Sequence, residues 1–265
     1  MAERQDKPHK VAEVLRAVIG KTDKKYYTSA VILAAGSSSR MGGDSTKQFI
    51  ELDGVPVVAR TLAEFEKSPL IDEIIIVAKA DEIDNYSDFA EKYGITKPFK
   101  VIEGGETRQD SARCGVDAVN EKSKFIAIHD AARCLITTDM IYKACHGAYL
   151  HGAAVLAVKA VDTVKIGDKS AFIEETPERK MTWQAQTPQV FKINAFRAAS
   201  YIARDEKFEG TDDASLLEHI RIPVKLVEGS RENIKVTEPL DVYLAEAILR
   251  ARSEKKELDS SEVTK

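Results

Sequence analysis

A short stretch rich in glycine and serine contains the first residues that could bind phosphate. Gly36 follows the apolar run 30–35, and Arg40 and Lys47 come soon after it. Glycine lets backbone N–H groups approach an anion, a guanidinium binds phosphate through a planar fork, and an ammonium adds a point charge. This combination is typical of a nucleoside triphosphate site. An ordinary strand-to-helix connection has the same pattern, which matches neither the Walker loop nor the Gly-x-Gly-x-x-Gly fingerprint.

Two other segments carry polar groups that suit a nucleotide. Asp130, within His129-Asp-Ala-Ala-Arg133, is expected at a strand end, where a carboxylate could hold Mg²⁺ or its waters. It could equally cap a turn and pair with Arg133. In the segment 104–111, two glycines would let a flat base approach the backbone, and Glu106 and Ser111 could hydrogen-bond its edge. A helix cap explains that segment as well, and both interpretations can hold together.

Three later segments have ordinary explanations when taken singly. Lys235 lies in Asn233-Ile-Lys-Val-Thr237, and a loop lysine is most often simply solvated. The run 211–215 resembles a helix N-terminus, where acidic side chains offset the helix dipole. The polar segment 183–189 around the single tryptophan has no role that residue types alone reveal.

The elements that must position these residues alternate between strand and helix. The pattern predicts strands at 30–35, 73–78, 100–102, 125–129, 153–158 and 224–227. It predicts helices at 57–67, 84–93, 111–119, 138–149, 193–203, 213–219 and 239–251, the last capped by Thr237. This order implies an α/β fold with a mainly parallel sheet and helices on both faces. Ligands bind beyond the C-terminal strand ends of such sheets, where Gly36, Gly104 and Asp130 fall.

One segment interrupts the alternation. Residues 162–166 and 171–174 each alternate apolar and polar side chains around the turn-like 167–170, which predicts a β-hairpin. An isolated hairpin is marginal in water, so we expect it to pack against something. A second subunit is a good candidate, because paired arms readily form a two-fold interface.

Bulk properties set the remaining expectations. The net charge of −4 gives no general argument for nucleic acid or membrane binding, and no apolar run is long enough to cross a bilayer. The three cysteines are widely spaced, which favours a reducing cytoplasm. Residues 1–28 predict a helical extension with apolar side chains at helical spacing over 11–19, and they do not resemble a secretory signal. The charged segment 253–265 is expected to be a flexible tail.

Taken in order, the motifs resemble the 2-C-methyl-D-erythritol 4-phosphate cytidylyltransferases over roughly residues 29–250. The set comprises Ala-Ala-Gly…Arg-Met, Lys-Gln-Phe, Gly-Gly…Arg…Asp-Ser, His-Asp-Ala-Ala-Arg, Asp-Thr-Val-Lys, Gln-Thr-Pro-Gln, Thr-Asp-Asp-Ala-Ser and Asn-Ile-Lys-Val-Thr. The resemblance implies a Rossmann-like nucleotidyltransferase domain at 29–252, with a dimerisation arm at about 160–182. It also implies that CMP passes from CTP to the substrate phosphate, with Mg²⁺ required, in non-mevalonate isoprenoid precursor biosynthesis.

The resemblance also implies residue roles. Arg40 and Lys47 would hold the CTP phosphates, Lys235 would contact the α-phosphate, and Asp130 would face the metal. The remaining nucleotide site would comprise Ala34, Ala35, Gly36, Gly104, Glu106 and Ser111. The methylerythritol phosphate pocket would comprise Arg133, Thr163, Arg179, Thr187 and Thr211, of which Thr163 and Arg179 would reach the neighbouring subunit's site.

The sequence departs from the family pattern at a few positions. Ser38 replaces a glycine and Thr46 a proline in the phosphate loop, Cys134 replaces a proline, and Glu106 replaces the commoner aspartate. Two alternatives stay open: a ribitol-5-phosphate cytidylyltransferase and a nucleotide-binding regulator without turnover. Ala-Ala-Gly, Ala-Ala-Arg and the full Thr-Asp-Asp-Ala-Ser favour methylerythritol phosphate, and the retained charged residues favour an enzyme.

Overall fold

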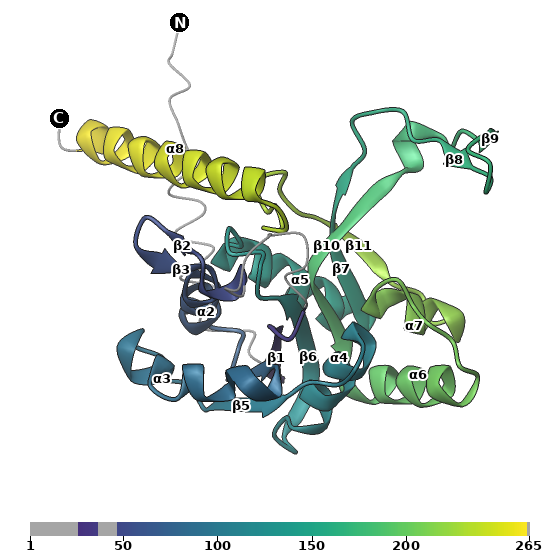
Figure 1. Cartoon of the computed structure of the whole chain (residues 1–265), viewed down its shortest axis with the longest axis horizontal. Helices are drawn as coiled ribbons and strands as arrows, with labels where there is room; N and C mark the ends of the chain where they lie inside the picture. Colours follow the sequence, from purple (N-terminus) through teal and green to yellow (C-terminus); the bar gives the residue numbers. More distant parts are fainter. Residues whose placement is uncertain (1–25, 37–46, 264–265) are drawn as a thin grey trace, which may run out of the picture.

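A seven-stranded sheet forms the centre of the molecule in the computed structural model, which describes residues 26–36 and 47–263 (Figure 1). The strand order is β11-β7-β10-β6-β1-β4-β5. Strand β1 pairs parallel with β4 and β6, β4 pairs parallel with β5, and β7 pairs parallel with β11. Strand β10 runs antiparallel to both β6 and β7. The bounds are β1 Tyr27–Leu33, β4 Glu73–Ala78, β5 Phe99–Glu103, β6 Ser123–Asp130, β7 Ala153–Lys159, β10 Trp183–Lys192 and β11 Lys225–Glu228.

Helices cover both faces of this sheet, as predicted. Alternate residues of β1 point to opposite faces, so Ala30 and Ile32 pack with Leu62 of α2 and Ile141 of α5. Val31 packs in a second cluster that draws on α4, α6 and α7. The helix bounds are α2 Val57–Lys67, α3 Phe89–Lys92, α4 Arg108–Asp117, α5 Thr138–His151, α6 Ile193–Asp205, α7 Asp213–His219 and α8 Pro239–Val263.

Several local predictions were wrong, each for an identifiable reason. Strand β10 was not predicted, because its first half is polar and it contains Pro188, where the register with β7 shifts. The helix expected at 84–93 is instead the 3-10 segment η2 (Ala80–Tyr86) followed by the short α3. Helix α4 starts earlier than 111, because Thr107 caps it by accepting from the Asp110 N–H.

The last helix also differs from its prediction. It runs past residue 251 to Val263, so the segment after 253, where we expected fraying, is helical up to that point. At its start, the Asp241 carboxylate accepts hydrogen bonds from the N–H groups of Thr237 and Glu238. The cap therefore comes from an acid inside the first turn rather than from the Thr237 side chain. The predicted N-terminal helix lies outside the described residues.

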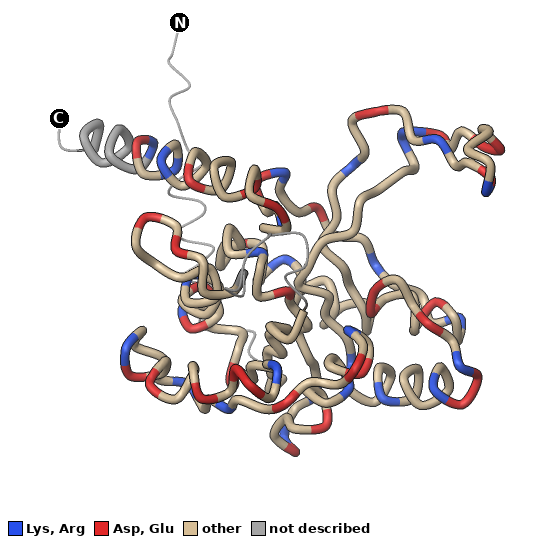
Figure 2. Tube along the Cα trace, in the orientation of Figure 1, with Lys and Arg blue, Asp and Glu red and all other residues tan. Residues whose placement is uncertain are grey.

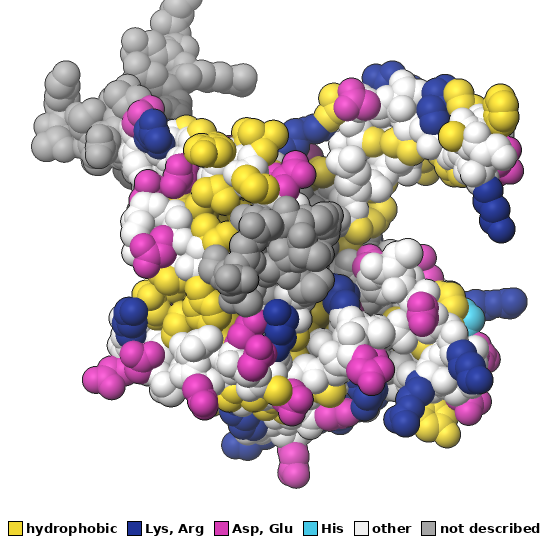
Figure 3. Space-filling model, viewed as in Figure 1, with side chains coloured by type: hydrophobic (Ala, Val, Ile, Leu, Met, Phe, Trp, Pro, Cys, Tyr) yellow, Lys and Arg dark blue, Asp and Glu magenta, His cyan; other side chains and the backbone are white. Residues whose placement is uncertain are grey.

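The predicted hairpin is present as a separate two-stranded sheet that projects from the body (Figure 1). It comprises β8 Ile166–Gly167 and β9 Ile173–Glu175. Apolar side chains are exposed on this arm (Figure 3), including Phe172 at 73% and Met181 at 75%. Basic and acidic residues are interspersed along the arm and along most of the described chain (Figure 2). None of the described helices combines the length and apolarity needed to span a bilayer.

Candidate functional site

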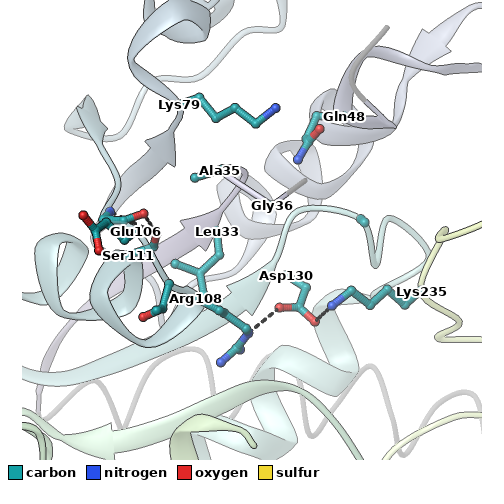
Figure 4. Close-up of a pocket in the computed structure, with 13 residues that line it drawn as sticks. Leu33, Ala35, Gly36, Gln48, Lys79, Glu106, Arg108, Ser111, Asp130 and Lys235 are labelled. Atoms are coloured by element: carbon teal, nitrogen blue, oxygen red, sulfur yellow. Dashed lines mark hydrogen bonds and ion pairs between the residues drawn. The ribbon is translucent and has the colours of Figure 1, made fainter. Parts of the chain in front are cut away.

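A pocket of about 410 Å³ lies where the C-terminal ends of β1 and β6 meet the loop after β5. This volume is in the range that holds small-molecule ligands. Figure 4 shows Asp130, Arg108 and Lys235 along one side, with Lys79 and Gln48 on the other. The lining residues are Leu33, Ala35, Gly36, Gln48, Lys79, Gly105, Glu106, Thr107, Arg108, Ser111, Asp130, Ala132 and Lys235.

Much of the predicted nucleotide site converges here. A smaller adjoining pocket adds Gly104 to this surface and shares Ala35 and Glu106 with the first. Ala34 lies just beneath, where its backbone carbonyl accepts a hydrogen bond from the Gln48 side chain. Arg40, Ser38 and Thr46 lie outside the described residues. Lys47 begins the short helix η1 (Lys47–Phe49), and its side chain is not among those described.

The loop after β5 needs glycine for close packing. A Cβ on Gly104 would lie 2.7 Å from Ser111 Oγ and 2.9 Å from Ala35 Cβ, closer than real Cβ atoms approach. The Gly105 N–H donates to Ser111 Oγ over 3.1 Å, which ties the loop to the first turn of α4. The loop therefore packs closely against Ala35 and the first turn of α4, and Gly105 and Ser111 line the pocket there.

Asp130 is the centre of an ion-pair cluster. Its Oδ2 lies 2.9 Å from Lys235 Nζ and 3.7 Å from Arg133 Nε, and its Oδ1 lies 3.3 Å from Arg108 Nε. Burial would raise the pKa of this carboxyl, but the charges of Arg108 and Lys235 outweigh burial and hold the pKa well below its usual range. Asp130 is therefore ionised at neutral pH.

The loop that carries Lys235 is fastened to the β6 end. The Val236 N–H donates to the Ala132 carbonyl over 2.9 Å, and Arg133 Nη1 donates to the Asn233 carbonyl over 2.9 Å. Asn233 is buried and donates to the Thr187 carbonyl over 3.1 Å. These contacts hold Lys235 beside Asp130 although the two residues are far apart in sequence.

Residues predicted for the acceptor pocket divide into two groups. Thr187 and Arg133 lie next to Asp130, and the Thr187 hydroxyl accepts from the Asp130 N–H over 3.1 Å. On the arm, Arg179 Nη2 donates to Thr163 Oγ1 over 3.2 Å, and both side chains are exposed. Thr211 is also exposed, just before α7. All five acceptor residues are absent from the described pocket lining: Arg133, Thr163, Arg179, Thr187 and Thr211.

His129 is a structural neighbour of this site. It is buried, with its Nδ1 2.9 Å from Thr187 Oγ1 and its Nε2 3.3 Å from the Arg133 carbonyl. Because that carbonyl can only accept, Nε2 carries the proton, and Nδ1 accepts from the Thr187 hydroxyl. Burial lowers the pKa of His129 to about 3, so the imidazole is neutral in the folded protein.

This neutral imidazole predicts a pH dependence of stability. The folded pKa lies below the unfolded value of about 6.5, so protonation favours unfolding as pH falls. Between about pH 7.5 and 5.5, His129 should cost the folded state about 1.4 kcal/mol, and a His129→Gln variant should lack this loss. Urea unfolding of both proteins at the two pH values measures the difference. Equal losses in the two proteins would contradict a neutral buried His129.

Sequence reasoning gave no role to several pocket residues, notably Gln48, Lys79 and Arg108. Arg108 was part of the Gly-Gly…Arg…Asp-Ser motif, but its partners lie on other elements and only the fold identifies them. In the part of the chain that the structure describes, no three His, Cys, Asp or Glu side chains gather as a metal cage. Asp130 and Glu106 are the carboxylates that line the pocket.

Comparisons with known proteins agree on one family. The family description 2-C-methyl-D-erythritol 4-phosphate cytidylyltransferase matches residues 28–251. A protein of that name from Caldanaerobacter subterraneus is 42% identical over 223 residues, which is 84% of this chain and 98% of that protein. A similarly named protein from Syntrophus aciditrophicus is 41% identical over 222 residues, covering 83% of this chain and 95% of that protein.

Solved structures show the same likeness. The 4-diphosphocytidyl-2C-methyl-D-erythritol synthase from Anaerococcus prevotii matches with a TM-score of 0.78 at 32% identity, covering 86% of this chain and 100% of that one. The 2-C-methyl-D-erythritol 4-phosphate cytidylyltransferase from Thermus thermophilus matches with a TM-score of 0.68 at 28% identity, covering 84% and 99%. The central α/β sheet is thus shared with these proteins.

Proposed function

The chain belongs to the 2-C-methyl-D-erythritol 4-phosphate cytidylyltransferase family, and on this premise we propose how its residues divide the work of the reaction. As a member, it is a cytidylyltransferase of isoprenoid biosynthesis. It transfers CMP from CTP to 2-C-methyl-D-erythritol 4-phosphate, giving 4-diphosphocytidyl-2-C-methyl-D-erythritol and diphosphate. The observation that carries the assignment of roles is the Asp130–Lys235 ion pair at the edge of the pocket.

We place cytosine against the loop after β5. There the Gly105 backbone and the Ser111 hydroxyl are held at hydrogen-bonding distance from each other. Ala34, Ala35, Gly104 and Glu106 would complete this part of the surface, and Glu106, which lines the pocket, would accept from the exocyclic amine. The triphosphate would then extend past Gly36, which lines the pocket, and Arg40 and Lys47 would bind it.

Catalysis in this arrangement rests on charge and position. An oxygen of the acceptor phosphate attacks the α-phosphorus in line with the departing diphosphate, so no covalent enzyme intermediate is required. Lys235 offsets charge on the α-phosphate, while Arg40 and Lys47 do so along the leaving diphosphate. Two polyanions must meet, so fixed cations supply most of the rate enhancement.

The pocket suits a Mg²⁺ that arrives with CTP. Mg²⁺ is commonly held by one or two carboxylates plus substrate phosphates and waters, rather than by an all-protein cage. Asp130 provides one ionised carboxylate at the place where the phosphates would lie. When bound, the ion would neutralise phosphate charge, and Asp130 would be its protein ligand.

We further propose that a homodimer completes the acceptor site. Arg179 and Thr163 contact each other on the projecting arm, and neither lines the pocket of its own chain. The arm exposes Phe172 and Met181, which would be covered by a second copy. Arg133, Thr187 and Thr211 would contribute from the chain that holds CTP. Free thiols at Cys114, Cys134 and Cys145 suit work in the cytoplasm.

A diphosphate-release assay tests the acceptor. We expect release with CTP and 2-C-methyl-D-erythritol 4-phosphate, and a kcat/KM at least about tenfold lower with ribitol 5-phosphate, because a pocket built to hydrogen-bond one polyol disfavours another. Faster release with ribitol 5-phosphate would overturn the acceptor assignment. Absence of release with either acceptor would instead support a nucleotide-binding regulator.

A further inference from the structure

Arg108 connects three elements at the edge of the pocket. It is the first residue of α4, and its guanidinium reaches the ends of two other elements. Nε lies 3.3 Å from Asp130 Oδ1 at the end of β6, and Nη2 lies 2.8 Å from Asp213 Oδ2 in the first turn of α7. Figure 4 shows Arg108 and Lys235 approaching Asp130 from opposite sides.

The two oxygens of Asp130 have different partners. Oδ1 faces Arg108, whereas Oδ2 faces Lys235 at 2.9 Å. A carboxylate held at both oxygens cannot rotate freely about its last torsion. Oδ2 also lies 3.7 Å from Arg133 Nε, so two of the three cations are on the same side of the carboxylate. Without Arg108, Oδ1 would lose its described ion pair, and the carboxylate would turn toward Lys235 and Arg133, which would draw the Lys235 ammonium away from the pocket.

Asp213 fixes Arg108 in turn. Its side chain is only 1% exposed, and its described ion pair is the one with Arg108. Burial raises the pKa of Asp213, and the charge and hydrogen bond of Arg108 oppose this shift. Burial lowers the pKa of Arg108, but Asp213 and Asp130 more than reverse this and keep it charged. Asp213 is close in sequence to Thr211, which belongs to the proposed acceptor pocket.

We infer that Arg108 is a positioning residue for CMP transfer, which holds the Asp130 carboxylate so that Lys235 points at the α-phosphate. The inference rests on the proposed role of Lys235. The same guanidinium also links Asp130, at the end of β6 beside the proposed CTP site, to Asp213, at the start of α7 near the proposed acceptor site. Arg108 acts through Asp130 and Lys235, so its loss should lower kcat more than it weakens CTP binding.

A double-mutant cycle with Lys235 tests this dependence. In the otherwise unchanged enzyme, Arg108→Gln should lower kcat about thirtyfold, while the Kd for CTP measured by calorimetry changes less than about threefold. In a Lys235→Ala background, the same Arg108→Gln change should lower single-turnover transfer less than about threefold, because the group it positions is absent. Arg108→Lys should recover only part of kcat, since one ammonium cannot replace the fork that joins both carboxylates.

Controls separate positioning from folding. Arg113→Gln lies on the same helix, pairs with Asp110 and Asp117 near the surface, and should leave kcat within about twofold. If Arg108→Gln does not fold, combining it with Asp213→Asn removes the unpaired buried charge. Unchanged kcat, an equal loss in both Lys235 backgrounds, or a loss confined to CTP affinity would overturn the inference. Full activity of Lys235→Ala would instead overturn the proposed role of Lys235.

Discussion

An Asp130→Asn variant should bind CTP and lose kcat by about 10²- to 10⁴-fold, with little change in overall fold. The substitution keeps the shape of the side chain and removes the one charge that Arg108, Arg133 and Lys235 share. The amide would also turn an N–H₂ group toward one of these cations, which have no acceptor to offer it. Lys235 would then lose its anchor, and Mg²⁺ would lose its proposed protein ligand.

Steady-state kinetics with saturating CTP and acceptor measures this effect, and thermal unfolding checks the fold. Asp117→Asn is the matched control, because that carboxylate is 59% exposed and lies 3.8 Å from Arg113 at the surface. It should retain kcat within about twofold. A kcat for Asp130→Asn within tenfold of the unchanged enzyme would show that the carboxylate does not organise the site.

Local sequence patterns were sufficient where an element buries a regular face. The run Glu73–Ala78 is buried at every residue, α2 spans the residues that its apolar spacing predicts, and α7 begins at the capping box of Asp212 and Ser215. Strand β10 could not be recognised in the same way, because its pairing partners lie far away in sequence and its polar half forms hydrogen bonds that only the assembled fold provides. Gln186, for example, donates to the Ser230 carbonyl and accepts from the Asn233 side chain.

The candidate site, like the fold, could be predicted from the sequence only in part. The rule that ligands bind at the C-terminal strand ends brought Gly36, the loop near Gly104 and Asp130 together correctly. Composition and spacing could not connect Lys235 to Asp130; only the family resemblance suggested it. Neither approach identified the contacts of Arg108, because they depend on where α4 starts and on the meeting of three separate elements.

Mixing two inactive variants should restore activity if the arm completes the neighbouring site. Arg179→Ala and Lys235→Ala alone should each lower kcat/KM by at least about 10²-fold, because each removes a fixed cation from the reacting phosphates. In a mixed dimer, one site would combine an intact Lys235 with an intact Arg179 from the partner's arm. Its other site would lack both residues. Random mixing in equal amounts makes about half of the dimers mixed, and one site in each mixed dimer is complete. The mixture should therefore recover about a quarter of the activity of the enzyme without substitutions.

Two different affinity tags allow the mixed species to be purified and its composition proved before the assay. Purified mixed dimers should then reach about half of the unchanged activity per dimer, because one site in two is complete. The control is a mixture of the Lys235→Ala and Asp130→Asn variants, because Lys235 and Asp130 line the pocket of the same chain. That pair should not recover, since every site would lack one of the two residues. Proven Arg179–Lys235 mixed dimers without recovery would mean that the arm does not serve the neighbouring site, and Arg179 would then act within its own chain or not at all.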